Sequence, residues 1–175
     1  MPTYTRFADI PPFTPWSSYR VDIPWHYLEH SLARYATDYG LELDPDFQRG
    51  HVWSRDQQIA YVEHCLCGGT STNMLHWNCL GWRAHTGEHP LVLVDGKQRL
   101  TAVRAFLSDG IPAFGTKYSK YEDHLRMVGP TFKFHINDLT TRKAVLQWYL
   151  ELNAGGVVHT EDEIEKVRRL LEAEK

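Results

Sequence analysis

The chain has 175 residues, of which 42% are hydrophobic, 13% aromatic and 23% charged. This is enough apolar material for one domain with a core, and it excludes a largely disordered chain. The net charge of −3 argues against a protein that holds a long nucleic acid through many phosphates. No stretch approaches the length of an apolar membrane helix, and three cysteines make no disulfide framework. We therefore expect a cytoplasmic protein with no membrane partner.

The first 24 residues differ from the rest of the chain. They carry five prolines, which exclude a long helix. We interpret residues 1–24 as a proline-rich N-terminal arm that wraps a single domain formed by residues 25–175.

Helices and strands alternate along the predicted domain. Helices are indicated by apolar residues at helical spacing or by capping residues at 25–39, 54–67, 96–110 and 141–152, and from 160 onward. Within the second of these, Ser54 and Gln57 have the spacing of a capping box. Strands are indicated by short apolar or alternating runs at 41–43, 74–80, 91–94 and 132–136. This interleaving predicts a compact α/β or α+β domain.

The strongest candidate site is the turn between the apolar strand at 91–94 and the helix that follows it. Gly96 permits a sharp turn, and the N–H groups and positive dipole at a helix start favour an anion such as phosphate. Lys97 and Arg99 add donors there, and Asp95 can hold Mg²⁺ or orient a water. The alternative is a polar turn in which Asp95 caps the helix and pairs with Arg99.

A second cluster lies in the loop before the capping box. Trp53 or Phe47 can stack on a base there, and Arg49 can meet a phosphate. The alternative is that both aromatic residues anchor the loop to the core while Gln48 bonds to backbone.

Histidine and cysteine residues between positions 64 and 79 are numerous enough to suggest zinc. However, Cys65 and Cys67 lie two residues apart on a predicted helix, so they point to nearly opposite faces. This spacing favours buried cysteines over a zinc site.

Residues 95–101 read Asp-Gly-Lys-Gln-Arg-Leu-Thr. They resemble the Asp-Gly-Gln-Gln-Arg motif, followed by Leu-Thr, of the GmrSD-type restriction endonuclease N-terminal domain family, part of the ParB/sulfiredoxin-like superfamily. Two further segments match that family in order: Gln48-Arg49 with Trp53-Ser54, and Leu-Asn-x-Gly-Gly at 152–156. The resemblance spans about residues 40–170, and Lys97 departs from the family's first Gln.

This resemblance implies a ParB/sulfiredoxin-like fold, a small mixed sheet flanked by helices, with a nucleotide pocket at the Asp-Gly turn. It implies that Asp95, Gln98 and Arg99 are catalytic, and Asp95 is the expected Mg²⁺ ligand. The residues expected to bind the nucleotide are Gln48, Arg49, Trp53, Gly96, Lys97, Thr101 and Asn153.

The resemblance predicts a nucleotide-binding domain linked to DNA restriction, phage defence or phage–host conflict. Its candidate activity is Mg²⁺-dependent hydrolysis of a nucleoside triphosphate. Two alternatives stay open: a non-enzymatic module that binds DNA or a protein, and a small metal-dependent nuclease. Restriction members of the family carry a long helical extension and often a separate nuclease domain. The 175 residues leave no room for either, so DNA or a partner effector or nuclease subunit is the expected macromolecular partner.

Overall fold

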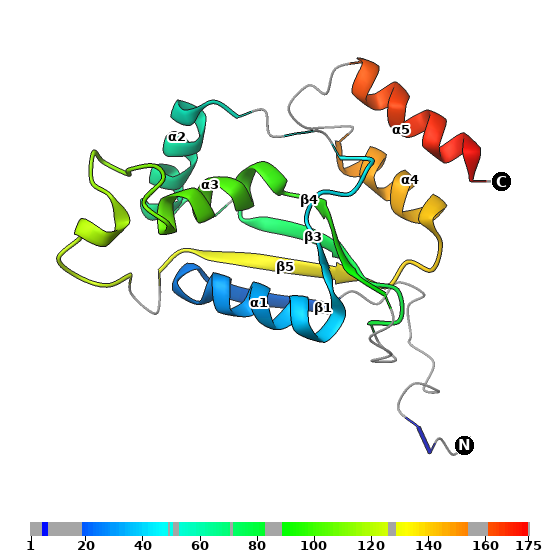
Figure 1. Ribbon diagram of the computed structural model, residues 1–175, viewed down its shortest axis with the longest axis horizontal. Coiled ribbons are helices and arrows are strands. Elements are labelled where there is room, and N and C mark those ends of the chain that lie inside the picture. The colour runs from blue at the N-terminus through cyan, green and yellow to red at the C-terminus, as the bar shows by residue number, and fades with distance from the viewer. Residues whose placement is uncertain are drawn as a thin grey trace.

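The computed structural model describes residues 5–6, 19–48, 50, 53–70, 72–82, 89–125, 129–153 and 161–174. Its centre is a five-stranded sheet in the order β1-β5-β3-β4-β2 (Figure 1). The strands are β1 (Tyr19–Pro24), β2 (Leu41–Glu42), β3 (Met74–Asn78), β4 (Leu91–Asp95) and β5 (Thr131–Asn137). The β1–β5 and β3–β4 pairs are antiparallel, and the β3–β5 and β2–β4 pairs are parallel. The mixed α+β class predicted from the sequence is therefore confirmed.

Among the described residues, five α-helices and two short 3₁₀ helices lie around the sheet. They are η2 (Trp25–Tyr27), α1 (Leu28–Tyr39), α2 (Arg55–Leu66), α3 (Lys97–Leu107), η4 (Tyr118–Lys120), α4 (Arg142–Asn153) and α5 (Glu161–Ala173). In Figure 1, α4 and α5 lie together near one end of the sheet, and α2 lies near the other. Within the described part of the chain, no helix has the length and apolar character that a membrane crossing needs.

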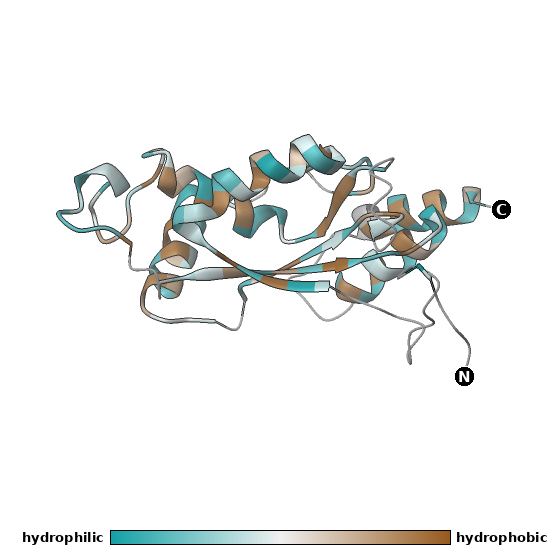
Figure 2. Cartoon of the chain, turned by 90° about the horizontal axis from the view of Figure 1, so that it is seen from below, coloured by the Kyte–Doolittle hydropathy of each residue, from teal (hydrophilic) through white to brown (hydrophobic). Residues whose placement is uncertain are grey.

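The core lies on both faces of β4. Leu91 and Leu93 belong to a large apolar cluster with α1, α2 and α3, whereas Val94 belongs to a smaller one with α4 and α5. A strand covered on both faces reads as a continuous apolar run, which explains the sequence of β4. Figure 2 shows apolar residues concentrated along the strands and on the helix sides that meet them. The carboxyl end of β4 is thus held firmly between two layers of helices.

Strand β1 lies within the segment that we predicted to be an N-terminal arm. Residues 19–24, assigned to the arm because of their prolines, pair with β5 along their whole length. Pro24 is tolerated because it is the last residue of a strand at the edge of the sheet, where its missing N–H costs little. The sheet therefore includes residues from Tyr19 onward. Apart from Thr5 and Arg6, the rest of the predicted arm lies outside the described residues.

The capping box predicted at the start of α2 is confirmed. The backbone N–H of Gln57 donates to Ser54 Oγ at 3.2 Å, and the N–H of Ser54 donates to Gln57 Oε1 at 2.8 Å. These two bonds fix the residue at which the preceding loop ends and α2 begins.

The cap should contribute measurably to stability. We expect Ser54→Ala to lower the free energy of unfolding by about 1 kcal/mol, because the N–H of Gln57 loses its acceptor. Urea denaturation followed by circular dichroism measures this change. Ser54→Asp restores an acceptor and should stay close to wild type. An equal loss in both variants would show that the cap is not the source.

Candidate functional site

The candidate site is a cavity of about 390 Å³ where β4 ends and α3 begins. It lies between the β4–α3 turn, the loop before α2, and the carboxyl end of α4. Eight of the residues predicted for the site line it: Gln48, Trp53, Asp95, Gly96, Lys97, Gln98, Arg99 and Asn153. Thr101 lies further along α3 and is not among the described lining residues, and Arg49 falls outside the described part of the chain.

Gly96 is the residue on which the turn depends. Its φ angle of +108° lies in the left-handed region, and a Cβ atom there would come within 2.3 Å of Leu75 Cδ2. Both facts require glycine, since a side chain would meet backbone strain and a clash together. Gly96 is also the N-cap of α3 and has no side chain with which to cap it. Gly96, Lys97, Gln98 and Arg99 all line the cavity, so the positive end of the α3 dipole lies in its wall.

Asp95 makes two contacts through one oxygen. Its Oδ2 accepts a hydrogen bond from Arg99 Nη2 and lies 3.4 Å from Nδ1 of His76. Burial raises the pKa of Asp95, but the contact with His76 and the positive charge of Arg99 outweigh it, so the pKa lies below its usual range. The pairing with Arg99 is the one that the alternative interpretation foresaw. The accompanying helix cap is not formed, because Gly96 occupies the N-cap position.

Two cations approach the cavity from the first turn of α3. Arg99 Nη1 donates to the carbonyl of Thr72 at 3.2 Å while Nη2 bonds Asp95. Lys97 Nζ pairs with Asp44 of the loop after β2. Each cation is thus held by a partner at the edge of the cavity.

The two glutamines act on the backbone of neighbouring segments. Gln98 donates to the carbonyl of Gly50 at 3.0 Å and accepts from the N–H of Trp53 at 3.2 Å. Gln48 is buried, and its amide donates to the carbonyl of Leu93 in β4. In this structure both side chains therefore position the loop before α2, as the alternative interpretation proposed for Gln48.

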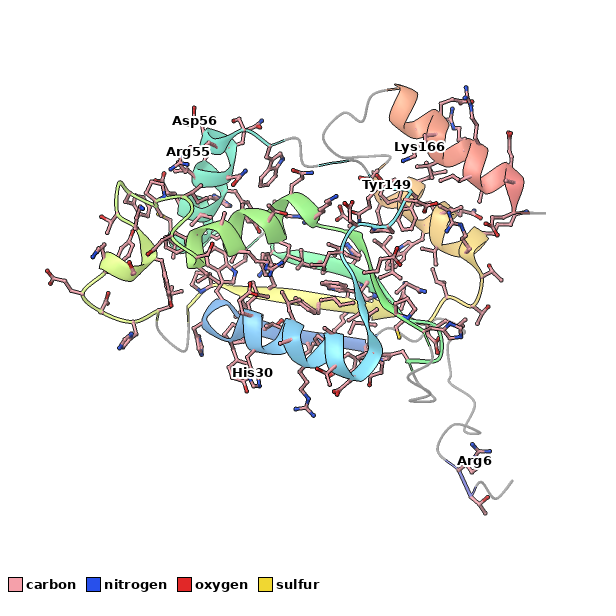
Figure 3. The ribbon with its side chains drawn as sticks, in the orientation of Figure 1. Arg6, His30, Arg55, Asp56, Tyr149 and Lys166 are labelled. Carbon is pink, nitrogen blue, oxygen red and sulfur yellow. The ribbon has the colours of Figure 1, made fainter. Side chains whose placement is uncertain are left out.

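Two helices fix the beginning of the same loop. Arg142 of α4 pairs with the carboxylate of Asp46 at 2.8 Å, and Lys166 of α5 donates to the Asp46 carbonyl at 2.5 Å. Figure 3 shows Lys166 on α5 and Tyr149 on α4 in this region. The loop is thus attached to β4, α3, α4 and α5.

Aromatic side chains form another part of the wall. Trp53 packs against Tyr61 of α2 with ring centroids 5.3 Å apart, and both line the cavity. The Tyr61 hydroxyl donates to the Thr72 carbonyl at 3.1 Å, and burial raises its pKa far above the usual range. Phe47, our other candidate for stacking on a base, is buried against Tyr149 and does not line the cavity among the described residues.

The carboxyl end of α4 supplies the last segment of the wall. Asn153 lines the cavity and donates to the carbonyl of Tyr149, four residues earlier, at 2.7 Å. Leu152 lies beside it in the lining. The glycines of the Leu-Asn-x-Gly-Gly segment fall outside the described residues.

Sequence reasoning did not assign Tyr61, Thr72, Tyr149 or His76 to the site. The two tyrosines occupy buried faces of helices, a position that core residues share. Thr72 contributes its backbone carbonyl, which leaves no signal in the residue type. His76 drew attention only as a possible zinc ligand. His76 lies opposite Asp95 in the pairing of β3 with β4, and this pairing cannot be read from the sequence of either strand.

The charges at the site bear on the predicted Mg²⁺. Asp95 is the only carboxylate among the described lining residues, and no group of three or more potential ligands occurs in the described ranges. Mg²⁺ is commonly held by one or two carboxylates together with substrate phosphates. One carboxylate in the described lining is compatible with that mode of Mg²⁺ binding.

Comparison with protein-family profiles, curated protein sequences and solved structures finds no match for the chain. The GmrSD-type relationship and the ParB/sulfiredoxin-like fold therefore stay predictions that rest on the sequence motifs.

The bonds of Gln98 to the loop yield a prediction about backbone protection. Gln98→Leu removes both bonds, so the Trp53 amide should exchange its hydrogen faster and unfolding free energy should fall by about 1–2 kcal/mol. Amide exchange followed by NMR measures the first effect. The Cys79 amide, bonded to Asn137 in the sheet at 3.0 Å, is the internal control. Gln98→Glu keeps an acceptor and should preserve more of the protection, and unchanged Trp53 exchange in Gln98→Leu would contradict the assignment.

The lowered pKa of Asp95 yields a pH prediction. Because the carboxyl group releases its proton more readily in the folded chain, its contribution to stability is present above the unfolded pKa of about 4 and is lost as pH falls below it. Wild type should therefore lose more unfolding free energy than Asp95→Asn between about pH 5 and pH 3. Urea titrations at several pH values test this, and parallel curves for the two proteins would contradict it.

Proposed function

We propose that the chain binds a nucleotide in the cavity at the β4–α3 turn. The observation that carries the proposal is the combination of Lys97 and Arg99 at an uncapped helix start with aromatic rings in the wall of one cavity of about 390 Å³. A phosphate group suits the first feature, because helix N-termini and guanidinium groups both bind anions well. A planar base suits the aromatic rings in the wall, on which it can stack. The volume lies in the range of small-molecule sites.

In this arrangement the phosphates lie over the first turn of α3. Arg99 and Lys97 neutralise their charge, and the face of Trp53 flanks the base. Asp95 is the carboxylate that would hold Mg²⁺ or orient a water. Mg²⁺ supplies charge neutralisation for the phosphates when bound. Hydrolysis of a nucleoside triphosphate is thus the activity that we assign to this site, and a role in DNA restriction or defence follows from the motif resemblance.

A ligand panel tests nucleotide binding. Thermal shifts are measured with ATP, GTP, CTP, UTP and the four deoxynucleoside triphosphates, with and without Mg²⁺. A ligand at 100 times its Kd stabilises the folded state by about 2.7 kcal/mol. Arg99→Ala should weaken binding by about 10-fold or more, since a charge-assisted hydrogen bond contributes about 1.5–3 kcal/mol.

Arg104→Ala is the matched control for this loss. Arg104 lies on the same helix, pairs with Glu29 at 2.6 Å, and is not among the described residues that line the cavity. Its replacement should leave nucleotide affinity near wild type. A flat panel for wild type would reject the proposal. Duplex DNA binding that Trp53→Ala abolishes would indicate a binding module instead, and Mg²⁺-dependent DNA cleavage that Asp95→Asn abolishes would indicate a nuclease.

A further inference from the structure

The Asp95 carboxylate contacts two basic side chains. Arg99 lines the cavity, whereas His76 is not among the described lining residues. Arg99 Nη2 donates to Oδ2, and Nδ1 of His76 lies 3.4 Å from the same oxygen. This Nδ1 atom is buried, and among the described residues its contact with Oδ2 falls short of hydrogen-bond geometry. A buried polar atom without a partner is rare in folded proteins and calls for a physical explanation.

The fold holds the His76 ring in this position. His76 lies opposite Asp95 at a point where the β3–β4 register shifts, and such irregularities redirect side chains near functional sites. The ring packs against His135 of β5 and Trp148 of α4, with centroids 5.4 and 5.5 Å away. His76 is thus kept beside the carboxylate by two neighbouring rings.

The Asp95–Arg99 pair opposes anion binding. A phosphate that takes the Nη2 donor of Arg99 has to displace Oδ2 of Asp95 from it. If the phosphate wins and nothing replaces Arg99, a largely buried carboxylate loses its charged partner, which is costly. In the absence of Mg²⁺, a donor already beside Oδ2 offsets that cost without rearrangement of the fold.

We infer that His76 is a positioning residue that hydrogen-bonds to Asp95 in place of Arg99 when a phosphate binds Arg99. As Arg99 Nη2 leaves Oδ2, the N–H at Nδ1 of His76 donates to that oxygen, and the 3.4 Å contact closes into a hydrogen bond. The inference rests on the proposed function. This exchange gives the buried Nδ1 atom a hydrogen bond in the bound state. It also frees Arg99 to bind the phosphate while Asp95 keeps a donor.

The test uses inorganic triphosphate without Mg²⁺, with ATP and GTP in parallel, each titrated by calorimetry. Inorganic triphosphate engages Arg99 whatever base the site prefers. His76→Leu removes the donor and should weaken triphosphate binding by about 10-fold, the size of a charge-assisted hydrogen bond. His76→Asn carries an amide nitrogen near the position of Nδ1 and should recover most of the affinity.

Two controls separate this role from a structural one. His135→Leu removes the neighbouring ring, which also packs on Trp148 at 6.0 Å, and should leave the affinity near wild type. In an Asp95→Asn background, His76→Leu should have little further effect, because no carboxylate is left to accept the bond. Circular dichroism and melting temperature show whether each variant folds. If His76→Leu does not fold, His76→Phe, which keeps a ring but has no donor, should show the same loss of affinity.

The outcomes are distinguishable. Wild type that binds none of the three probes and none of the eight nucleotides of the panel, with or without Mg²⁺, rejects the proposed function, and the inference falls with it. Wild type that binds a nucleotide of the panel but none of the three Mg²⁺-free probes rejects the inference alone. Wild type that binds while His76→Leu binds equally well, or loses no more than His135→Leu, rejects the inference alone. An undiminished effect of His76→Leu in the Asp95→Asn background also rejects it.

Discussion

The close approach of Gly96 to Leu75 is the constraint on which the site depends. Because position 96 carries no side chain, β4 can turn directly into α3 while Leu75 stays packed in the core beneath the turn. This turn sets Asp95 at the end of a strand and Arg99 on the first turn of a helix, close enough to pair. The helix start, its two cations and the carboxylate are therefore brought together by one turn of the chain.

The rest of the cavity is attached to that unit by side chains that bond to backbone. Gln98 of α3 holds the loop before α2 at two points, and Gln48 reaches from that loop to β4. Each of these bonds joins residues about 45 positions apart in the chain. Segments that are far apart in the sequence are thus joined around the cavity, and the two glutamine amides hold them together through bonds to backbone.

Local patterns predicted most of the elements and much of the lining. The capping box of α2, the apolar run of β4 and the Asp-Gly turn are written in consecutive residues, so single-sequence reasoning reaches them. Register between distant strands is not written locally, and for this reason His76 was missed as a neighbour of Asp95. The prolines of residues 1–24 exclude a long helix, and from this we predicted an arm. A strand at the edge of a sheet tolerates proline as well, and residues 19–24 form such a strand. Tyr61 and Tyr149 have the spacing of ordinary core residues, and only the packing of helices places them at a cavity.

The shortness of β2 has a consequence for the edge of the sheet beside the candidate cavity. β2 pairs with β4 only at Leu91 and Val92, and one residue later the carbonyl of Leu93 is met by the amide of Gln48 instead of by a strand. A longer β2 would continue along β4 towards Asp95, which lines the candidate cavity. The cavity therefore lies where the pairing of β4 with β2 stops, and the amide of Gln48 bonds the carbonyl that a longer strand would otherwise meet.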